Sequence, residues 1–274
     1  WINGETGATI PFSTYDNGAD LVETSLLFQG LLAARQYFDN SSAEEIKLRD
    51  DITKLWKEVE WDWFHKDNEK VLYWHWSPNN GWQMNLKVSG WNESLITYVL
   101  AASSPTHPIN KEVYVQGWAR NGEMVNNSTY YGHKLALGPE LGGPLFFAHY
   151  SFLGLDPNRL QDQYTNYWEQ NRNHTLINYQ YCVDNPKHFA GYSENNWGLT
   201  ASDGNEGYSA YSPTNDKGVI APTAALSSIP YTPVESMRAL HFFYYKLGDK
   251  LWSDYGFKDA FNLSEGWFDD QYLA

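Results

Sequence analysis

The chain has 274 residues and a net charge of −14. The negative charge disfavours a nucleic acid partner, because a phosphate backbone would be repelled. Flat aromatic rings fit the apolar faces of sugars. The 13 tryptophans and 20 tyrosines therefore favour a carbohydrate partner, although large aromatic cores also occur without ligands. The single cysteine, Cys182, excludes an intrachain disulfide and a multi-cysteine metal site. No apolar run reaches membrane-spanning length.

The first predicted element is a long apolar helix that begins within residues 15–25 and ends near 39–40. Asp16, Asp20 and Glu23 follow an i, i+4, i+7 spacing, which predicts that they share one helix face. Uncompensated buried carboxylates are costly and are tolerated mainly at functional sites. The alternative is that Asp16 or Asn17 caps the helix and that the acids stabilise its first turn. That alternative accounts poorly for Glu23.

Two elements of different kinds follow this helix. Ser42 and Glu45 form a capping-box pattern, which predicts an amphipathic outer helix over 43–59. An apolar helix beside an amphipathic one suggests two layers of helices. Residues 71–88 are prone to form strands and contain a turn, so we expect a β-hairpin or an extended loop there. It carries Trp74, Trp76 and Trp82, which are candidate sugar contacts.

The middle of the chain repeats the pattern of an acid ahead of an apolar helix. Glu93 precedes an apolar helix that starts near Leu95, and first-turn stabilisation is the alternative role. A short helix over 111–119 and a strand pair within 130–137 are expected next. A third apolar helix is predicted over 145–153, where His149 is either a satisfied core histidine or a sugar hydroxyl partner. One long helix is predicted over 160–183.

The last third opens with a long polar, glycine-rich stretch over 185–222. Long loops of this kind are usually functional or disordered, and Tyr192, Glu194 and Trp197 are candidate binding residues if the loop is functional. A short apolar helix over 222–228 is followed by a capping-box pattern at Thr232 and Glu235. That pattern predicts a helix that runs to residue 247.

The candidate residues together suggest glycosidic-bond chemistry. This reaction needs a proton donor at the leaving oxygen and a second carboxylate that acts as base or nucleophile. Glu93, beside Trp91 and an apolar run, is the better candidate for a raised pKa. Asp16, Asp20 and Glu23 would raise one another's pKa by repulsion. We expect no cofactor and no metal site.

The motifs of the chain are similar to those of a known family. They are WING at 1–4, GADLVET at 18–24, LYWHWSP at 72–78, ESLITYVLA at 93–101, GGPLFFAHYSF at 142–152 and NWGLTA at 196–201. The chain resembles the glucoamylase-like glycoside hydrolases. These include bacterial endo-β-1,2-glucanases and the related domain of cyclic β-1,2-glucan synthases.

The resemblance implies a fold and a chain organisation. The fold is all-α, an (α/α)6 barrel or toroid, with a small β-hairpin insertion near 71–88. Residues 1–274 would form a single catalytic domain. Relatives extend beyond both ends, and this sequence starts at Trp1 without an initiator methionine. We therefore expect a barrel that is incomplete at both ends and a chain that is a fragment of a longer one.

The resemblance also implies an activity. Glu93 matches the general acid, and Asp16, Asp20 and Glu23 line the acidic pocket. The expected reaction is hydrolysis of β-glucan, preferably β-1,2-linked, with inversion. A retaining transglycosylase or cyclase, an α-glucan hydrolase and a non-catalytic glycan-binding protein remain alternatives. We expect an exported bacterial protein, periplasmic or secreted, that binds an oligo- or polysaccharide, with no nucleic acid partner. The sequence does not predict an oligomeric state.

Overall fold

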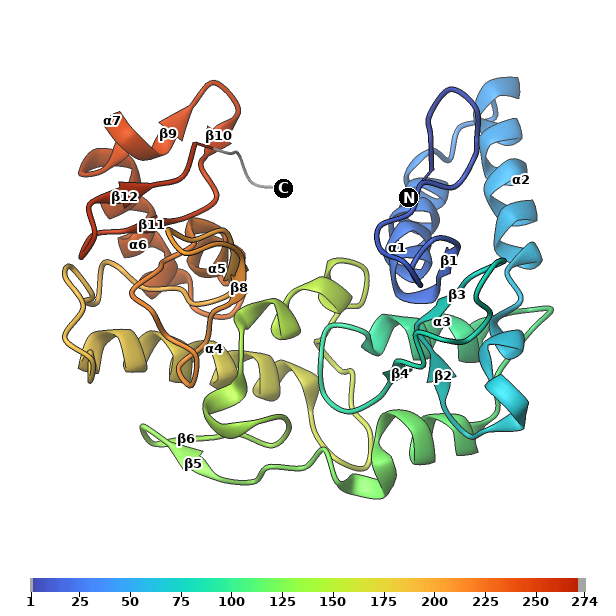
Figure 1. Cartoon of the computed structure of the whole chain (residues 1–274), viewed down its shortest axis with the longest axis horizontal. Coiled ribbons are helices and arrows are strands. Elements are labelled where there is room, and N and C mark those ends of the chain that lie inside the picture. Colours follow the sequence, from blue (N-terminus) through green and yellow to red (C-terminus); the bar gives the residue numbers. More distant parts are fainter. Residues whose placement is uncertain (1, 271–274) are drawn as a thin grey trace. The chain divides into compact units, whose positions relative to one another are not determined.

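The structure is a computed structural model that describes residues 2–270 (Figure 1). The described residues form two compact units. Unit 1 comprises 2–124 and 151–155, and unit 2 comprises 125–150 and 156–270. Both units are rich in helix, and every strand pairs with a single antiparallel partner in the described part of the chain. The helical class predicted from the sequence is therefore confirmed. No helix within 2–270 combines the length and apolar character needed to cross a bilayer.

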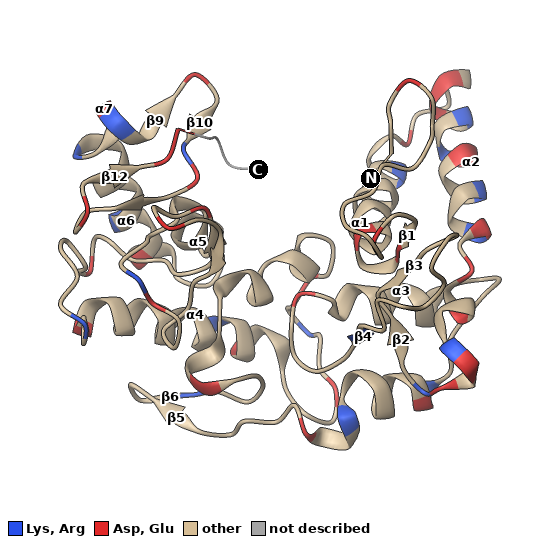
Figure 2. Cartoon of the chain, viewed as in Figure 1, with Lys and Arg blue, Asp and Glu red and all other residues tan. Residues whose placement is uncertain are grey.

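Unit 1 is built on three α-helices: α1 (Leu21–Tyr37), α2 (Ala43–Glu58) and α3 (Leu95–Ser103). Ser42 caps α2 by accepting a bond from Glu45 N at 3.2 Å, as predicted. The Glu45 carboxylate accepts bonds from the backbone and side-chain nitrogens of Asn40, and not from Ser42 N as in a reciprocal capping box. Figure 2 shows α2 as an alternation of acidic and basic turns, which fits an amphipathic helix. Helix α1 is apolar, but it is buried on one face only, since Leu27 and Tyr37 are exposed.

Short strands join the helices of unit 1. Strand β2 (Leu72–Tyr73) pairs with β4 (Lys87–Val88), which confirms a hairpin-like insertion at 71–88. Strand β3 (His75–Trp76) leaves this hairpin and pairs with β1 (Ala19–Asp20), directly before α1. The buried Tyr98 hydroxyl fixes α3 to the β2–β4 pair, because it donates to Val88 O at 2.8 Å and accepts from Leu72 N at 3.1 Å. Unit 1 also contains 3₁₀-helices at Trp61–Phe64, Lys66–Asn68 and Arg120–Gly122 and a π-helix at Val113–Trp118.

Unit 2 is organised around α4 (Tyr167–Asp184) and α6 (Pro233–Tyr245). Its smaller helices are α5 (Pro222–Leu226), α7 (Gly248–Leu251) and a 3₁₀-helix at Glu140–Gly142. Its strands form the pairs β5 (Thr129–Tyr130) with β6 (His133–Lys134), β7 (Ala201–Ser202) with β8 (Ser209–Ala210), β9 (Trp252–Ser253) with β10 (Gly256–Phe257) and β11 (Phe261–Asn262) with β12 (Trp267–Phe268). The short helix predicted at 222–228 and the strand pair predicted within 130–137 are confirmed.

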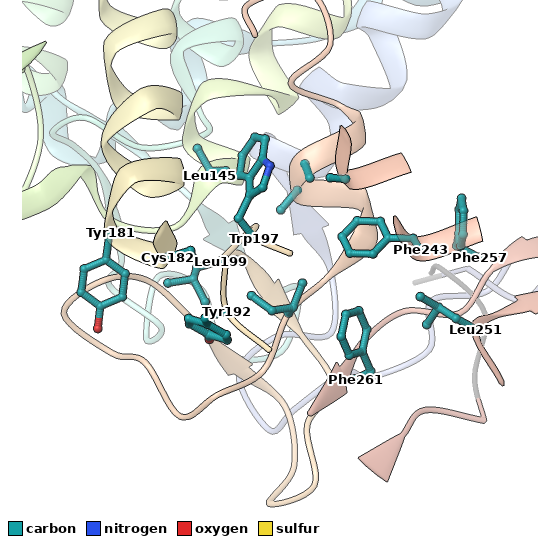
Figure 3. Packing of buried hydrophobic residues seen from close by; sticks show 14 residues of the cluster. Leu145, Tyr181, Cys182, Tyr192, Trp197, Leu199, Phe243, Leu251, Phe257 and Phe261 are labelled. Carbon is teal, nitrogen blue, oxygen red and sulfur yellow. The ribbon is translucent and has the colours of Figure 1, made fainter. Parts of the chain in front are cut away.

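The core of unit 2 gathers rings from segments that are far apart in the sequence (Figure 3). Trp197 and Phe261 are fully buried there, next to Phe243 of α6 and Cys182 of α4. Trp197 donates its indole N–H to Glu235 O at 3.3 Å. The 185–222 stretch is thus a long loop, as predicted, but part of it enters the core.

Two predicted helices of the middle region differ from the structure. Residues 145–153 form two 3₁₀ turns, Leu145–Ala148 and Tyr150–Leu153, instead of one α-helix. The helix predicted over 160–183 begins seven residues later, at Tyr167. Before it, Asp162 accepts bonds from Tyr164 N and Thr165 N, which makes a side-chain-stabilised turn that competes with helix.

Candidate active site

Asp16 and Asp20 meet at a histidine that the sequence analysis did not select. The β1–β3 pairing sets Asp20 directly opposite His75. His75 Nε2 lies 3.4 Å from Asp20 Oδ2 and 3.6 Å from Asp16 Oδ2. The prediction that Asp16, Asp20 and Glu23 share one helix face is wrong, because α1 begins only at Leu21. The β1–β3 pairing brings Asp20 to His75, whereas Asp16 reaches the same nitrogen from the loop before β1. Figure 2 shows acidic ribbon where β1 leads into α1.

Asp20 also has a structural role, because it is the N-cap of α1. Its Oδ1 accepts from Glu23 N at 2.9 Å, and its backbone carbonyl accepts from the Thr24 hydroxyl at 2.6 Å. The capping alternative therefore holds at Asp20, and not at Asp16 or Asn17. Asn17 instead bonds to the Ser77 hydroxyl, which ties the loop before β1 to the turn after β3.

Glu23 projects from the first turn of α1. Partial burial is the main cause that raises the pKa of its carboxyl, and the negative charges of Asp20 and Asp16 raise it further. Among the described residues, no lysine or arginine forms an ion pair with any of these three acids. The carboxyl of Glu23 therefore holds its proton more tightly than an isolated glutamate does.

Glu93 lies directly before α3, as predicted. Burial raises the pKa of its carboxyl, a hydrogen bond from its own backbone lowers it, and the charge of Glu23 raises it. The buried Ser151 hydroxyl donates to the Glu93 carbonyl and accepts from Ile96 N at 3.0 Å. Ser94, the N-cap of α3, makes no side-chain capping bond, so Ser151 supplies the cap from a distant part of unit 1.

A second link joins the helices that carry the acids. Ser25 Oγ of α1 and Thr97 Oγ1 of α3 lie 2.7 Å apart, and both residues are fully buried. This buried hydrogen bond favours one position of α1 along α3. It therefore helps to fix where Glu23 and Glu93 lie within unit 1.

The three predicted tryptophans of the hairpin region are partly exposed. Trp74 stacks against the His75 ring, with centroids 5.9 Å apart and an interplanar angle of 14°. Trp76 and Trp82 both pack against Trp63, at 5.1 and 4.9 Å between centroids. Trp63 is 44% exposed and was missed, although the aromatic run at 61–64 could have indicated it. This aromatic surface suits a sugar ring better than a sealed core would.

The other predicted substrate-binding residues lie in unit 2. Desolvation lowers the pKa of His149 to about 3, and its Nε2 lies 3.0 Å from Ser228 Oγ, as in a satisfied histidine, although the side chain keeps some exposure to solvent. Trp197 is fully buried in the core, and Tyr192 is 8% exposed and donates to Asp216 Oδ1 at 2.8 Å. The prediction that the loop over 185–222 presents these two rings for binding therefore does not fit their burial. Glu194 is exposed and pairs with Arg238 at 3.2 Å.

Two groups of side chains have a spacing that a metal ion could use, whereas the sequence predicted no metal site. One is Asp16, Asp20 and His75; the other, in unit 2, is Asp203, Asp259 and Asp269. Within each group, one donor atom per residue lies within 4.8 Å of the others. In the second group Asp259 Oδ2 also accepts from Asp203 N at 2.8 Å, so part of the cluster is explained by backbone bonding.

Residues 85–274 match the Glycoamylase family model, described as "Putative glucoamylase". The chain belongs to this family. The resemblance inferred from the motifs is thus confirmed. The match starts after the acidic residues of β1 and α1 and includes Glu93 and all of the described part of unit 2.

The chain is similar to three proteins whose names include a β-1,2-linked glucan or oligosaccharide substrate. It is 47% identical, over 295 residues, to an exo β-1,2-glucooligosaccharide sophorohydrolase (non-reducing end) of Parabacteroides distasonis, covering 100% of this chain and 41% of that protein. An endo-β-1,2-glucanase of Chitinophaga pinensis, solved with sophorotriose and glucose, is 52% identical with a TM-score of 0.96 and covers 100% of this chain. A β-1,2-glucanase structure of P. distasonis is 48% identical, with a TM-score of 0.96 and 98% of this chain covered. This chain spans 66% and 42% of those two structures, respectively.

Proposed function

We propose that the protein is a glycoside hydrolase that cleaves β-1,2-glucan. The observation that carries this proposal is that Glu93 is a partly buried carboxyl whose pKa is raised, and that Glu23 of the acid cluster in unit 1 acts on it electrostatically. The relatives whose names include β-1,2-glucan substrates support the choice of linkage.

In the proposed reaction Glu93 is the general acid. Its raised pKa keeps the carboxyl protonated at a higher pH than an ordinary glutamate. The proton passes to the glycosidic oxygen as the bond from that oxygen to the anomeric carbon breaks. An ionised carboxylate of the Asp16, Asp20 and Glu23 group takes a proton from water, whose oxygen attacks the anomeric carbon from the opposite face. The product sugar then has inverted configuration.

The aromatic surface of unit 1 has a matching role in this proposal. Trp63, Trp76 and Trp82 offer ring faces and edges at a partly exposed position. Rings of this kind bind the apolar face of a sugar, while the carboxylates bind its hydroxyl groups. Of the other predicted binding residues, we propose that the partly exposed Trp74 and the exposed Glu194 contribute to substrate binding in the whole protein.

The finer fold and the location of the protein belong to the same proposal. We propose that residues 1–274 contribute to a single (α/α)6 barrel domain, supported by the succession of apolar and amphipathic helices and by the family motifs.

We propose an exported protein, periplasmic or secreted, which is where a polymeric glucan would be met. Fractionation of the producing cells, followed by immunodetection, tests the location.

The activity is tested with β-1,2-glucan, β-1,3-glucan and starch as substrates. We expect reducing sugar from β-1,2-glucan, and a loss of at least about 10²-fold in kcat for Glu93→Gln, because the proton donor is removed. Glu112→Gln is the matched control, since Glu112 is exposed and also precedes a helix of unit 1. NMR of the first product anomer distinguishes inversion from retention. Activity that Glu93→Gln leaves unchanged would remove Glu93 as the acid.

A further inference from the structure

His75 is the described residue that contacts both aspartates of the acid cluster. Its ring is 7% exposed and lies on β3, opposite Asp20 on β1. The Nε2 atom faces the two carboxylates at 3.4 and 3.6 Å. These distances are slightly long for an N–H···O bond, as is common in unliganded sites that tighten around a substrate.

The surroundings of the ring restrict its movement. Trp74 stacks along one side of it, and strand pairing fixes the backbone at Asp20. The loop that carries Asp16 is closed by backbone bonds, since Phe12 N donates to the Asp16 carbonyl at 2.8 Å. Asp16 and Asp20 therefore approach one fixed nitrogen from two separate backbone segments.

The other ring nitrogen indicates which proton the ring carries. Nδ1 is buried without a hydrogen-bond partner. A protonated Nδ1 would bury an N–H donor with no acceptor, which costs more than leaving a lone pair unused in a neutral ring. The favoured tautomer therefore carries its proton on Nε2, the nitrogen that lies near the two carboxylates. One proton can satisfy one carboxylate oxygen at a time, so it orients the pair and does not neutralise it.

We propose that His75 is a positioning residue that holds Asp16 and Asp20 in a fixed orientation, by donating its Nε2 proton to them, and so prepares a carboxylate to accept a proton from water. The inference rests on the proposed hydrolase function. The charged groups that face the ring are Asp16, Asp20 and, from α1, Glu23.

The test compares two substitutions at the same position in the full-length protein. In Gln, the side-chain Nε2 can occupy nearly the place of the imidazole Nε2 and still donate, without being able to titrate. Phe fills the space and donates nothing. We expect His75→Phe to lower kcat on sophorooligosaccharides by about 10²-fold with KM nearly unchanged, since misplacement of a reacting group has an effect of this size. We expect His75→Gln to recover kcat to within about tenfold of the wild type.

Controls separate this result from a folding defect and from failure of the proposed function. His107→Phe removes a histidine–aspartate pair elsewhere in unit 1, with Asp62 at 3.1 Å, and should leave kcat unchanged. Tm and sophorotriose affinity are measured for every variant. An inactive wild type would reject the proposed hydrolase and not the geometry of His75. Turnover by His75→Phe equal to the wild type would overturn the inference. So would equal loss in His75→Gln and His75→Phe, or activity that a chelator abolishes and a divalent cation restores.

Discussion

At the scale of single residues, the distinctive chemistry lies in the carboxyl groups of Glu23 and Glu93. Burial is the main cause that raises the pKa of both. A carboxyl whose pKa is higher in the folded than in the unfolded chain binds more protons when folded. The stability that it contributes is therefore lost as pH rises from the ordinary value of 4.5 through the raised folded value. Ionised Glu93 thus destabilises the protein at neutral pH.

Glu93→Gln should consequently stabilise the fold while it removes the proposed activity. The amide keeps the size of the side chain and has no charge to bury. We expect Tm at pH 7 to rise by about 2–4 °C, which corresponds to roughly 1 kcal/mol. The difference from the wild type should shrink as pH falls through the raised folded pKa of Glu93 towards 4.5, and should be absent below that value. Calorimetry across this pH range, with Glu112→Gln as control, measures it. A Tm difference that is independent of pH would contradict the assigned cause.

The identities of the acidic residues could be predicted from the sequence, because a carboxylate ahead of an apolar segment is costly and therefore informative. The role of His75 could not, since it depends on β1 pairing with β3 across a long stretch of intervening chain. The one available signal was the alternation of side chains along a strand at 74–76, which places His75 on the opposite face from Trp74 and Trp76. The burial of Trp197 could not be predicted either, because the local sequence of a polar loop does not show whether its aromatic side chain packs into the core.

At the scale of elements, predictions succeeded where local bonds decide the structure and were wrong where distant residues supply the partners. The α2 cap at Ser42 is local and was predicted. At 145–153, Leu145 N donates to Leu199 O and Phe146 N to Thr200 Oγ1. Such distant acceptors anchor two 3₁₀ turns where apolar periodicity predicted an α-helix. Thr232 shows a milder case: α6 starts where its pattern indicated, but the Thr232 hydroxyl bonds to Ser228 O instead of capping the helix.

The close approach of β1 to β3 predicts different effects for two glycine substitutions. A Cβ at Gly18 would lie 2.4 Å from Trp76 O and 2.7 Å from Pro78 Cδ, so one strand must move. We expect Gly18→Ala to destabilise the protein by about 1–3 kcal/mol and to lower kcat, because the same strands hold Asp20 and His75. Gly30→Ala is the control: Gly30 is an exposed position within α1 with no atom near its Cβ. That change should stabilise by about 0.5–1 kcal/mol without affecting kcat. Denaturant unfolding and glucan kinetics measure both.

At the scale of the whole molecule, the helical class was predictable from helix periodicity and the division into two units was not. The division depends on contacts between residues far apart in sequence, such as Cys182, Trp197 and Phe261 in the core of unit 2. The single cysteine, Cys182, is fully buried in this core, and its burial raises the pKa of the thiol.

Cys182 should therefore report on opening of unit 2. We expect alkylation of the native protein to be at least about 10³-fold slower than in denaturant, because the thiol must first be exposed and ionised. Mass spectrometry after timed iodoacetamide pulses along a urea series measures the rate. The labelled fraction should follow the unfolding transition seen by tryptophan fluorescence. Fast labelling in the absence of urea would contradict the packing of this core.

The Ser151 bond to the Glu93 carbonyl has a consequence for biosynthesis. Residues 151–155 belong to unit 1, although the chain before and after them belongs to unit 2. A ribosome must therefore deliver more than fifty residues after Glu93 before the hydroxyl that caps α3 exists. The amino-terminal unit cannot complete its acid-bearing helix as an early co-translational product. Its maturation waits for part of the second unit to be synthesised.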